Sequence, residues 1–414
     1  MNPVLTAACA LLAPTLAAQT IQPPFSSHYS YVDLGTPAGI DTHLGGVAFK
    51  VGDPDALYVG GGAAVYRVPI TRDAAGHLTG FAGPAVKFAD APNIDGGLQF
   101  GPGGVLFFTR YRINELGQIA PGSTTMTKSV PLSPLGVLAS VGGLSFIPAG
   151  HPRAGDLLLA SYNASTVYTA TLTPDGSGTY DVSSVTPGPR LGNGGPEGVL
   201  YVPPGSPQFT DFEHLLVCEW RTGQIEVFHL DANGDPEPAS LQVFMTGLTG
   251  CAGAAIDPIG GDFVFGTWGG GDRVLAIEGF STPCGRSSNY GEATAGSGGL
   301  APTLTTEGCL ARGQTVQLMV GDGLGAARGV MLVGVRPQDV PLFGIAILVD
   351  PFTTIVHALG GTPDVPGEGT LVLNLKIPDD PGLLGAGFYL QSIYLDPGGP
   401  QGLSASDGLQ FNVR

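Results

Sequence analysis

Short hydrophobic runs separated by turns dominate the pattern of this chain. The clearest stretch spans residues 155–178, GDLLLASYNASTVYTATLTPDGSG, in which an apolar run, a tight turn and a second, alternating run precede an Asp-Gly turn. Alternation with a period of two residues, bounded by turn-forming residues, predicts β-strands joined in hairpins. Gly and Pro interrupt almost every stretch long enough for a helix, so the pattern predicts an all-β protein.

The same unit recurs five times between about residue 45 and residue 280. Its first strand reads GGVAF, GGLQF, GGLSF, EGVLY and AGAAI, beginning at Gly45, Gly96, Gly142, Glu197 and Ala252. The second strands are spaced by 49, 52, 58 and 48 residues, measured between Leu57, Leu106, Leu158, Leu216 and Val264. A period of about 50 residues with roughly four strands per unit is typical of a β-propeller. We therefore predict a propeller of five or six blades over residues 28–280.

Two further segments complete the predicted organisation. The sequence HYSYVDLG (residues 28–35) precedes the first unit and alternates like an outer strand, so we expect it to close the ring on the edge of the last unit. Residues 281–299 are rich in Gly and Ser and predict a linker. Residues 300–414 contain at least six apolar runs without the repeat, which predicts a β-sandwich.

Composition and the N-terminal segment indicate which kinds of partner the protein has and where in the cell it is located. Charged residues make up 12% of the chain and the net charge is −17, which disfavours nucleic acid and anionic lipid as partners. Residues 1–18, MNPVLTAACALLAPTLAA, predict a signal peptide and hence a secreted, cell-surface or periplasmic protein. The apolar part of this segment is too short to span a bilayer, and no later stretch reaches that length.

Four cysteines follow the predicted signal peptide, and they allow three pairings. Cys218 ends the second strand of the fourth unit and Cys251 precedes the first strand of the fifth, so a bridge between neighbouring blades is expected. Cys284 and Cys309 would then pair across the linker. Four free buried thiols are the alternative, although an oxidising compartment favours two disulfides.

Candidate binding residues gather where second strands end and first strands begin, because antiparallel pairing brings these points to one rim. The rim is predicted to contain Arg110, Tyr111, Tyr162, Asn163, Glu219, Trp220, Arg221 and Trp268. Both tryptophans of the chain occupy the same position of adjacent units. Aromatic rings beside amide and carboxylate groups suit a glycan or another extracellular protein. Packing between blades is the alternative explanation for the same aromatic residues.

The repeated units resemble the NHL-repeat and gluconolactonase-like propellers. The likeness rests on PEGVLYVPPG from Pro196 and on LLVCEWRTGQIEVFHLDANGD over residues 215–235. This resemblance implies a divalent cation, Ca²⁺ or Mg²⁺, held in the central channel by Glu197, Asn163 and Asp95, and a lactonase-type hydrolase. The first unit departs from that family, because Leu44-Gly45-Gly46 stands where the characteristic glutamate is expected.

The tail resembles a C-terminal module that recurs on exported bacterial proteins. The motifs are NYG from Asn289, LVDP from Leu348, IPDDPGLLG from Ile377 and YLQSIYLDPGGP from Tyr389. Three hypotheses follow for the whole chain. It is an exported binding protein for a glycan or extracellular protein, a metal-dependent lactonase-type hydrolase, or a structural exoprotein that self-associates through its sandwich.

Overall fold

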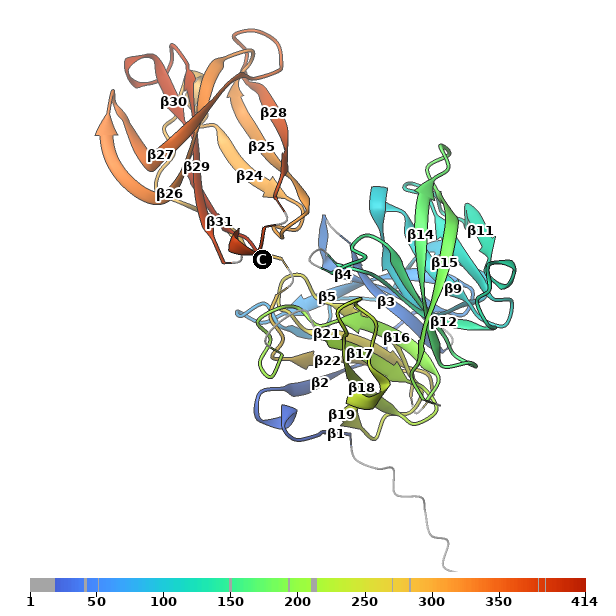
Figure 1. Cartoon of the computed structure of the whole chain (residues 1–414). Helices are drawn as coiled ribbons and strands as arrows, with labels where there is room; N and C mark the ends of the chain where they lie inside the picture. Colours follow the sequence, from blue (N-terminus) through green and yellow to red (C-terminus); the bar gives the residue numbers. More distant parts are fainter. Residues whose placement is uncertain are drawn as a thin grey trace, which may run out of the picture.

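The computed structural model describes two all-β bodies (Figure 1). The described residues are 19–40, 43–50, 52–148, 151–192, 194–209, 214–269, 271–282, 284–378, 380–383 and 385–414. Within them, helical structure is confined to 3₁₀ turns of three residues. The predicted signal peptide, residues 1–18, lies outside the described residues.

The first body consists of five sheets, each starting with one of the predicted repeat strands. The first sheet contains β3 (Leu44–Lys50), β4 (Asp53–Gly61), β5 (Ala64–Arg72), β6 (Leu78–Phe81) and β7 (Val86–Asp90). The second contains β8 (Ile94–Phe100), β9 (Leu106–Arg110), β10 (Glu115–Ile119) and β11 (Lys128–Pro131). The third contains β12 (Val141–Phe146), β13 (Leu157–Ser161), β14 (Thr166–Pro174) and β15 (Tyr180–Arg190). The fourth contains β16 (Pro196–Tyr201), β17 (His214–Glu219), β18 (Gln224–His229) and β19 (Gln242–Thr246), and the fifth contains β20 (Cys251–Ile256), β21 (Phe263–Thr267) and β22 (Val274–Glu278).

The five sheets are arranged as the blades of a propeller. Their innermost strands β3, β8, β12, β16 and β20 lie against one another in sequence order, and β20 also lies against β3, which closes the ring. Hydrophobic clusters fill the spaces between sheets, and the largest joins the fourth and fifth through residues such as Phe244 and Phe265. The predicted β-propeller is therefore confirmed as the fold.

Two N-terminal strands complete the last two blades. β2 (Ser30–Gly35) pairs with β22 as the outer strand of the fifth sheet, so the predicted closure by residues 28–35 is confirmed. β1 (Thr20–Ile21) pairs with β19 of the fourth sheet. The chain thus enters the propeller before residue 28, and both outer edges are covered by N-terminal residues.

Glycines allow the innermost strands to approach the axis closely. A Cβ atom added to Gly96 of β8 would lie 2.1 Å from the carbonyl oxygen of Glu197 in β16. One added to Gly142 of β12 would lie 2.7 Å from the carbonyl oxygen of Pro196. Only a residue without a side chain fits at such distances, which explains the paired glycines of the repeat.

The second body is a β-sandwich. One sheet contains β23 (Ser287–Tyr290), β26 (Arg328–Leu342), β27 (Ile345–Ala358), β29 (Gly387–Leu395), β30 (Leu403–Ala405) and β31 (Gly408–Asn412). The other contains β24 (Thr303–Glu307), β25 (Thr315–Leu324) and β28 (Pro366–Lys376). Side chains of both sheets, including Leu318 and Tyr394, form one buried core. Because β23 pairs with β31, the segment predicted as a linker contributes a strand to this body.

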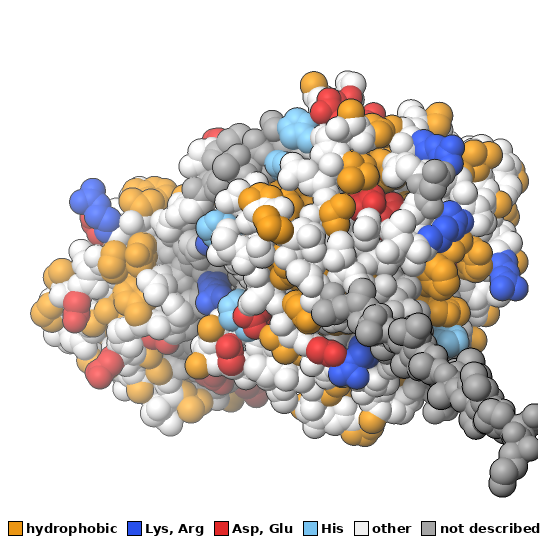
Figure 2. Space-filling view, turned by 90° about the horizontal axis from the view of Figure 1, so that it is seen from below, with side chains coloured by type: hydrophobic (Ala, Val, Ile, Leu, Met, Phe, Trp, Pro, Cys, Tyr) orange, Lys and Arg blue, Asp and Glu red, His pale blue; other side chains and the backbone are white. Residues whose placement is uncertain are grey.

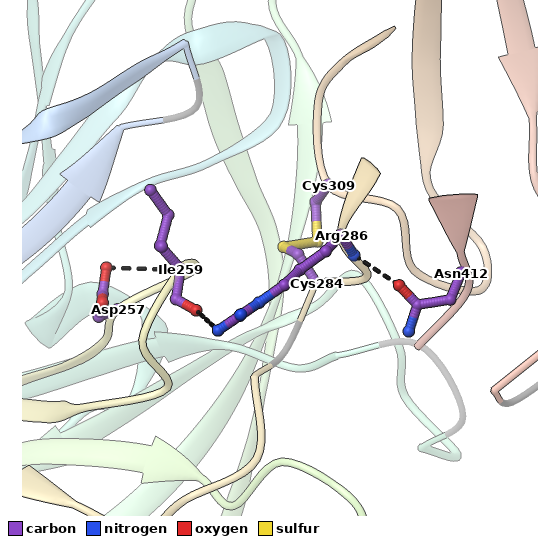
Figure 3. Close-up of a disulfide and its surroundings, with 6 residues drawn as sticks. All are labelled: Asp257, Ile259, Cys284, Arg286, Cys309 and Asn412. Atoms are coloured by element: carbon purple, nitrogen blue, oxygen red, sulfur yellow. Dashed lines mark hydrogen bonds between the residues drawn. A yellow bond between two sulfur atoms is a disulfide. The ribbon is translucent and has the colours of Figure 1, made fainter. Parts of the chain in front are cut away.

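The two bodies are joined beside the disulfide Cys284–Cys309, which confirms this predicted pairing (Figure 3). Arg286 lies between the two cysteines in the sequence. Its backbone N–H donates to Asn412 Oδ1 at 2.7 Å. Its guanidinium donates to the carbonyl oxygen of Ile259 in the propeller at 2.9 Å. Arg286 therefore links the two bodies.

The predicted bridge between Cys218 and Cys251 is wrong for this structure, because both are free buried thiols. The two thiols lie side by side. Burial and the neighbouring Cys218 thiol raise the pKa of Cys251. Sequence spacing placed the two residues correctly, but the sulfur atoms are not bonded.

The surface carries few charges. The face in Figure 2 shows acidic and basic side chains scattered among uncharged atoms. Among the described residues, no helix is both long and apolar enough to cross a membrane.

Candidate functional site: an aromatic rim above a buried carboxyl pair

Four blades present an aromatic residue at the same point of one propeller face. These residues directly follow the second strand of each blade: Tyr111, Tyr162, Trp220 and Trp268. In each, the backbone N–H donates to a carbonyl just before the blade's first strand, over 2.7–3.0 Å: Asn93, Ser140, Gly195 and Gly250. This shared bond holds the four side chains at the mouth of the propeller.

Three of the rings form a continuous row. Tyr111 and Tyr162 meet edge to face with centroids 5.6 Å apart, and Tyr162 and Trp220 do so at 6.1 Å. The guanidinium of Arg221 lies over the Tyr162 ring, 4.2 Å from its centroid, and donates to Asn163 Oδ1 at 3.4 Å. Burial raises the pKa of Tyr162, and the nearby Arg221 opposes this change.

Packing between blades accounts for part of the same arrangement. A Cβ atom on Gly250, which has φ +61°, would lie 2.7 Å from Trp220 Nε1 and 2.3 Å from the carbonyl oxygen of Trp268. Trp220 thus covers the start of the next blade and is only partly exposed. Trp268 keeps 36% of its surface exposed. The two explanations for the aromatics are therefore not exclusive, and Trp268 is the more available ring.

His43 belongs to the rim although sequence analysis missed it. Its ring stacks on Trp268 with centroids 4.5 Å apart and planes 19° from parallel. Its Nδ1 lies 3.2 Å from Asp272 Oδ1. His43 directly precedes β3, the first strand of the first blade. The rim was predicted where second strands end and first strands begin. The same criterion, applied to the start of the first blade, predicts His43.

Two predicted rim residues are buried instead. Arg110 is 8% exposed, and its guanidinium is bound within its own blade by Glu115, Ser129 and the carbonyl oxygen of Pro92. Glu219 is fully buried. Both residues end a second strand, so alternation points their side chains into the blade while the following residue faces outward.

A pair of carboxyl groups lies under the rim at the axis. Asp95 of β8 and Glu197 of β16 are 6% and 5% exposed and lie side by side, although their strands belong to non-adjacent blades; Asp95 Oδ2 and Glu197 Oε2 have no hydrogen-bond partner among the described residues. Burial raises the pKa of Asp95 to about 7. Burial and the Asp95 charge raise the pKa of Glu197 well above its usual range. The pair therefore retains a proton near neutral pH.

The predicted cation site is only partly assembled. Asp95 and Glu197 lie together, but Asn163 is exposed at the rim beside Arg221. The His, Cys, Asp and Glu side chains that the structure describes include no group of three able to hold a metal ion. The structure therefore brings together two of the three predicted ligands, Asp95 and Glu197, and leaves Asn163 at the rim.

A second acidic pair, Glu219 of β17 and Glu226 of β18, is buried within the fourth blade. Burial, followed by repulsion from Glu226, raises the pKa of Glu219 to about 8. Burial raises the pKa of Glu226 to about 7. Neither Glu219 oxygen has a hydrogen-bond partner among the described residues. The buried positions of Glu219 and Glu226 therefore favour the protonated carboxyl over the ionised one.

The opposite mouth of the propeller is covered by the sandwich. A cavity of about 250 Å³ separates the ends of the inner strands, at Phe146 and Tyr201, from Cys309 and Arg312 of the second body. The aromatic rim is therefore the propeller face that the sandwich leaves open.

Neither the family models nor the curated proteins gave a match to this chain. Solved structures with a similar arrangement include the PQQ domain of pyranose dehydrogenase from Coprinopsis cinerea, with 10% identity over 63% of this chain and 97% of that one, at a TM-score of 0.37. A gluconolactonase from Xanthomonas campestris shares 12% identity over 63% of this chain and 94% of that one, at a TM-score of 0.36. An auxiliary nutrient-binding protein from Bacteroides ovatus shares 14% identity over 60% of this chain and 76% of that one, at a TM-score of 0.34. At these identities the likeness concerns the fold and not the activity.

Proposed function

We propose that this protein is an exported binding protein whose aromatic rim takes up a glycan. The observation that carries the proposal is the row of rings formed by Tyr111, Tyr162 and Trp220, with Trp268 further round the same open face. Sugar rings present apolar C–H faces that pack on aromatic side chains, while amide and guanidinium groups bond their hydroxyls. Asn163 and Arg221 supply those groups at the rim.

Export is part of the same proposal. The predicted signal peptide and the Cys284–Cys309 disulfide both suit an oxidising compartment. The low density of charge suits a neutral polymer better than a polyanion.

The hydrolase alternative has weaker support. It needs Asp95, Glu197 and Asn163 as a cation site, and only the first two lie together. Hydrolysis of lactones in the presence of added Ca²⁺ or Mg²⁺ would revive it. Equal turnover by Glu197→Gln would show that any such activity does not use this pair.

The binding function is tested by affinity electrophoresis on a panel of neutral polysaccharides together with a glycan array. Trp268→Ala and Tyr162→Ala should each weaken retention at least tenfold, because each removes a stacking surface. Phe343→Ala is the matched control, since Phe343 is a 61% exposed aromatic of the sandwich. If both rim variants keep the parent's retention and melting temperature, these rings pack between blades and do not bind glycan.

A further inference from the structure

The sandwich ends on one side in two unpaired strand edges. β27 pairs only with β26, and β28 pairs only with β25, among the strands that the structure describes. The two edges start from a common corner, where the Gly360 N–H donates to the carbonyl oxygen of Thr370 at 2.7 Å. Beyond this corner each sheet presents a row of backbone groups without a neighbouring strand.

Each edge contains an uncharged stretch with exposed apolar side chains. On β27, residues 351–358 contain no Asp, Glu, Lys or Arg, and Phe352, Ile355 and Val356 are 62%, 41% and 79% exposed. On β28, residues 370–375 are also without charge, and Val372 is 54% exposed. Strand edges of soluble proteins usually carry charges, Pro or bulges that prevent pairing. The one Pro of β27, Pro351, and the three register shifts of its ladder with β26 all lie within residues 347–353, which leaves residues 353–358 regular.

The core of the sandwich is open on the same side. Leu371, Leu373 and Leu375 of β28 pack against the core but remain half-buried, as does Val333 of β26. Ile355 pairs with the fully buried Met331, yet keeps 41% of its surface exposed. A neighbour on this side would therefore cover core side chains as well as backbone groups.

We propose that these edges pair with the same edges of a second copy of this chain. Covering both sheets at once requires two strands separated by the spacing of a sandwich, about 10 Å. A second copy supplies that spacing, whereas a single extended peptide covers one sheet. Because the chain carries a net charge of −17, copies repel each other least where both surfaces are uncharged.

The regular part of β27 sets the register. Residues 353–358 pair without interruption with residues 328–333 of β26. We place the two-fold axis of an antiparallel pair of copies at Ile355, the partner of the buried Met331, which puts Ile355 opposite its own symmetry mate and Val356 opposite Thr354 of the second copy. The Met331–Ile355 row continues into the second molecule as an unbroken apolar row. Such a dimer is closed, because each edge is the other's partner.

The proposed edges belong to the sandwich and the aromatic rim to the propeller, so the pairing uses none of the rim residues. A dimer would therefore carry two open rims. The inference does not depend on what the rims bind.

Analytical ultracentrifugation of the chain without residues 1–18 tests the proposal. The parent should sediment with twice the mass of the chain, and Val356→Lys and Val372→Lys should each raise the dimer dissociation constant at least tenfold. Both replaced side chains are mostly exposed, so folding should be unaffected. Val335→Lys is the matched control, at a 53% exposed position of β26 away from both edges, and should remain dimeric. A monomeric parent, or dimers that persist in both edge variants, would overturn the proposal.

Cysteine cross-linking tests the register independently. Ile355→Cys should form an intermolecular disulfide under mild oxidation, because residues facing each other across a strand pair bring their Cβ atoms within about 5.5 Å. Val335→Cys is the control and should stay monomeric on a non-reducing gel. Absence of cross-linking by Ile355→Cys would contradict the two-fold pairing, as would equal cross-linking by the control.

Discussion

At the scale of single residues, the site is built from ionisable groups that folding keeps protonated. Burial raises the pKa values of Asp95 and Glu197 at the axis, and also those of Glu219 and Glu226 within the fourth blade. A carboxyl whose pKa is raised on folding favours the native state at low pH. That contribution is lost as the pH rises from the unfolded pKa, about 4.3, towards the folded one.

Glu219→Gln should therefore change the pH dependence of stability. The amide replaces the protonated acid and cannot ionise, so the variant should match the parent near pH 5. Near pH 9 it should be more stable by on the order of 4 kcal/mol, because the pKa of Glu219 is raised to about 8. Urea unfolding across this pH range measures the difference. The exposed Glu292→Gln serves as control and should follow the parent throughout; an E219Q curve parallel to the parent would refute the assignment.

The glycines of the inner strands make a second residue-scale prediction. Gly96→Ala should destabilise the propeller by about 3 kcal/mol, because its Cβ atom would stand 2.1 Å from the Glu197 carbonyl oxygen and neither backbone can withdraw from the axis. Gly83→Ala is the control, since its Cβ would make only an ordinary 3.5 Å contact with Pro69. Thermal melting followed by circular dichroism compares the two. Equal melting temperatures would show that the inner strands can move apart enough to accept a Cβ atom at position 96.

At the scale of elements, repeat spacing predicted strands well and their partners less well. Alternation placed β2 on the edge of the last blade, since its apolar positions needed a sheet to cover them. The two residues of β1 carry no such pattern, and only their pairing with β19 reveals them as a strand. The linker segment Ser287–Tyr290 is likewise polar, but pairs with β31. Short strands at a sheet edge are held by backbone bonds that leave no trace in side-chain pattern.

Ring closure by β2 makes a prediction at this scale. Leu34 is 9% exposed and packs with Val274 and Leu78 in the cluster between the fifth and first blades. Leu34→Ala should cost about 2 kcal/mol and expose the edge of β22. Limited proteolysis should then cut within residues 35–40 faster than in the parent. Val86→Ala, at a 64% exposed position of the first blade, should leave both stability and cleavage unchanged; similar values for the two variants would mean that β2 does not secure the ring.

At the scale of the whole molecule, the disulfide lies where the two bodies meet. Cys284 and Cys309 are 25 residues apart, and Arg286 between them binds both the sandwich and the propeller. Their bond shortens the unfolded chain at the start of the sandwich. The propeller has its own clusters of buried residues and does not contain either cysteine.

Cys284→Ser with Cys309→Ser should therefore destabilise the sandwich by about 3 kcal/mol, the loop-closure contribution of a bridge of this span. The propeller transition in calorimetry should move much less. Cys218→Ser controls for loss of a thiol, since it removes no bridge, and its effect should fall on the propeller transition. A single transition that shifts as a whole would indicate that the bodies unfold together.

The sequence alone determined what depends on local pattern. Strand alternation and turns at a period of about 50 residues specified a propeller, and the change of pattern after residue 280 marked a second body. The shared position of Tyr162, Trp220 and Trp268 was visible in the same alignment. The tertiary structure decided what depends on neighbours across blades. It buried Arg110 and Glu219, left Cys218 and Cys251 unbonded, brought Asp95 to Glu197 and set His43 on Trp268. Such contacts depend on how neighbouring blades are oriented around the axis. The repeat spacing along the chain does not specify that orientation.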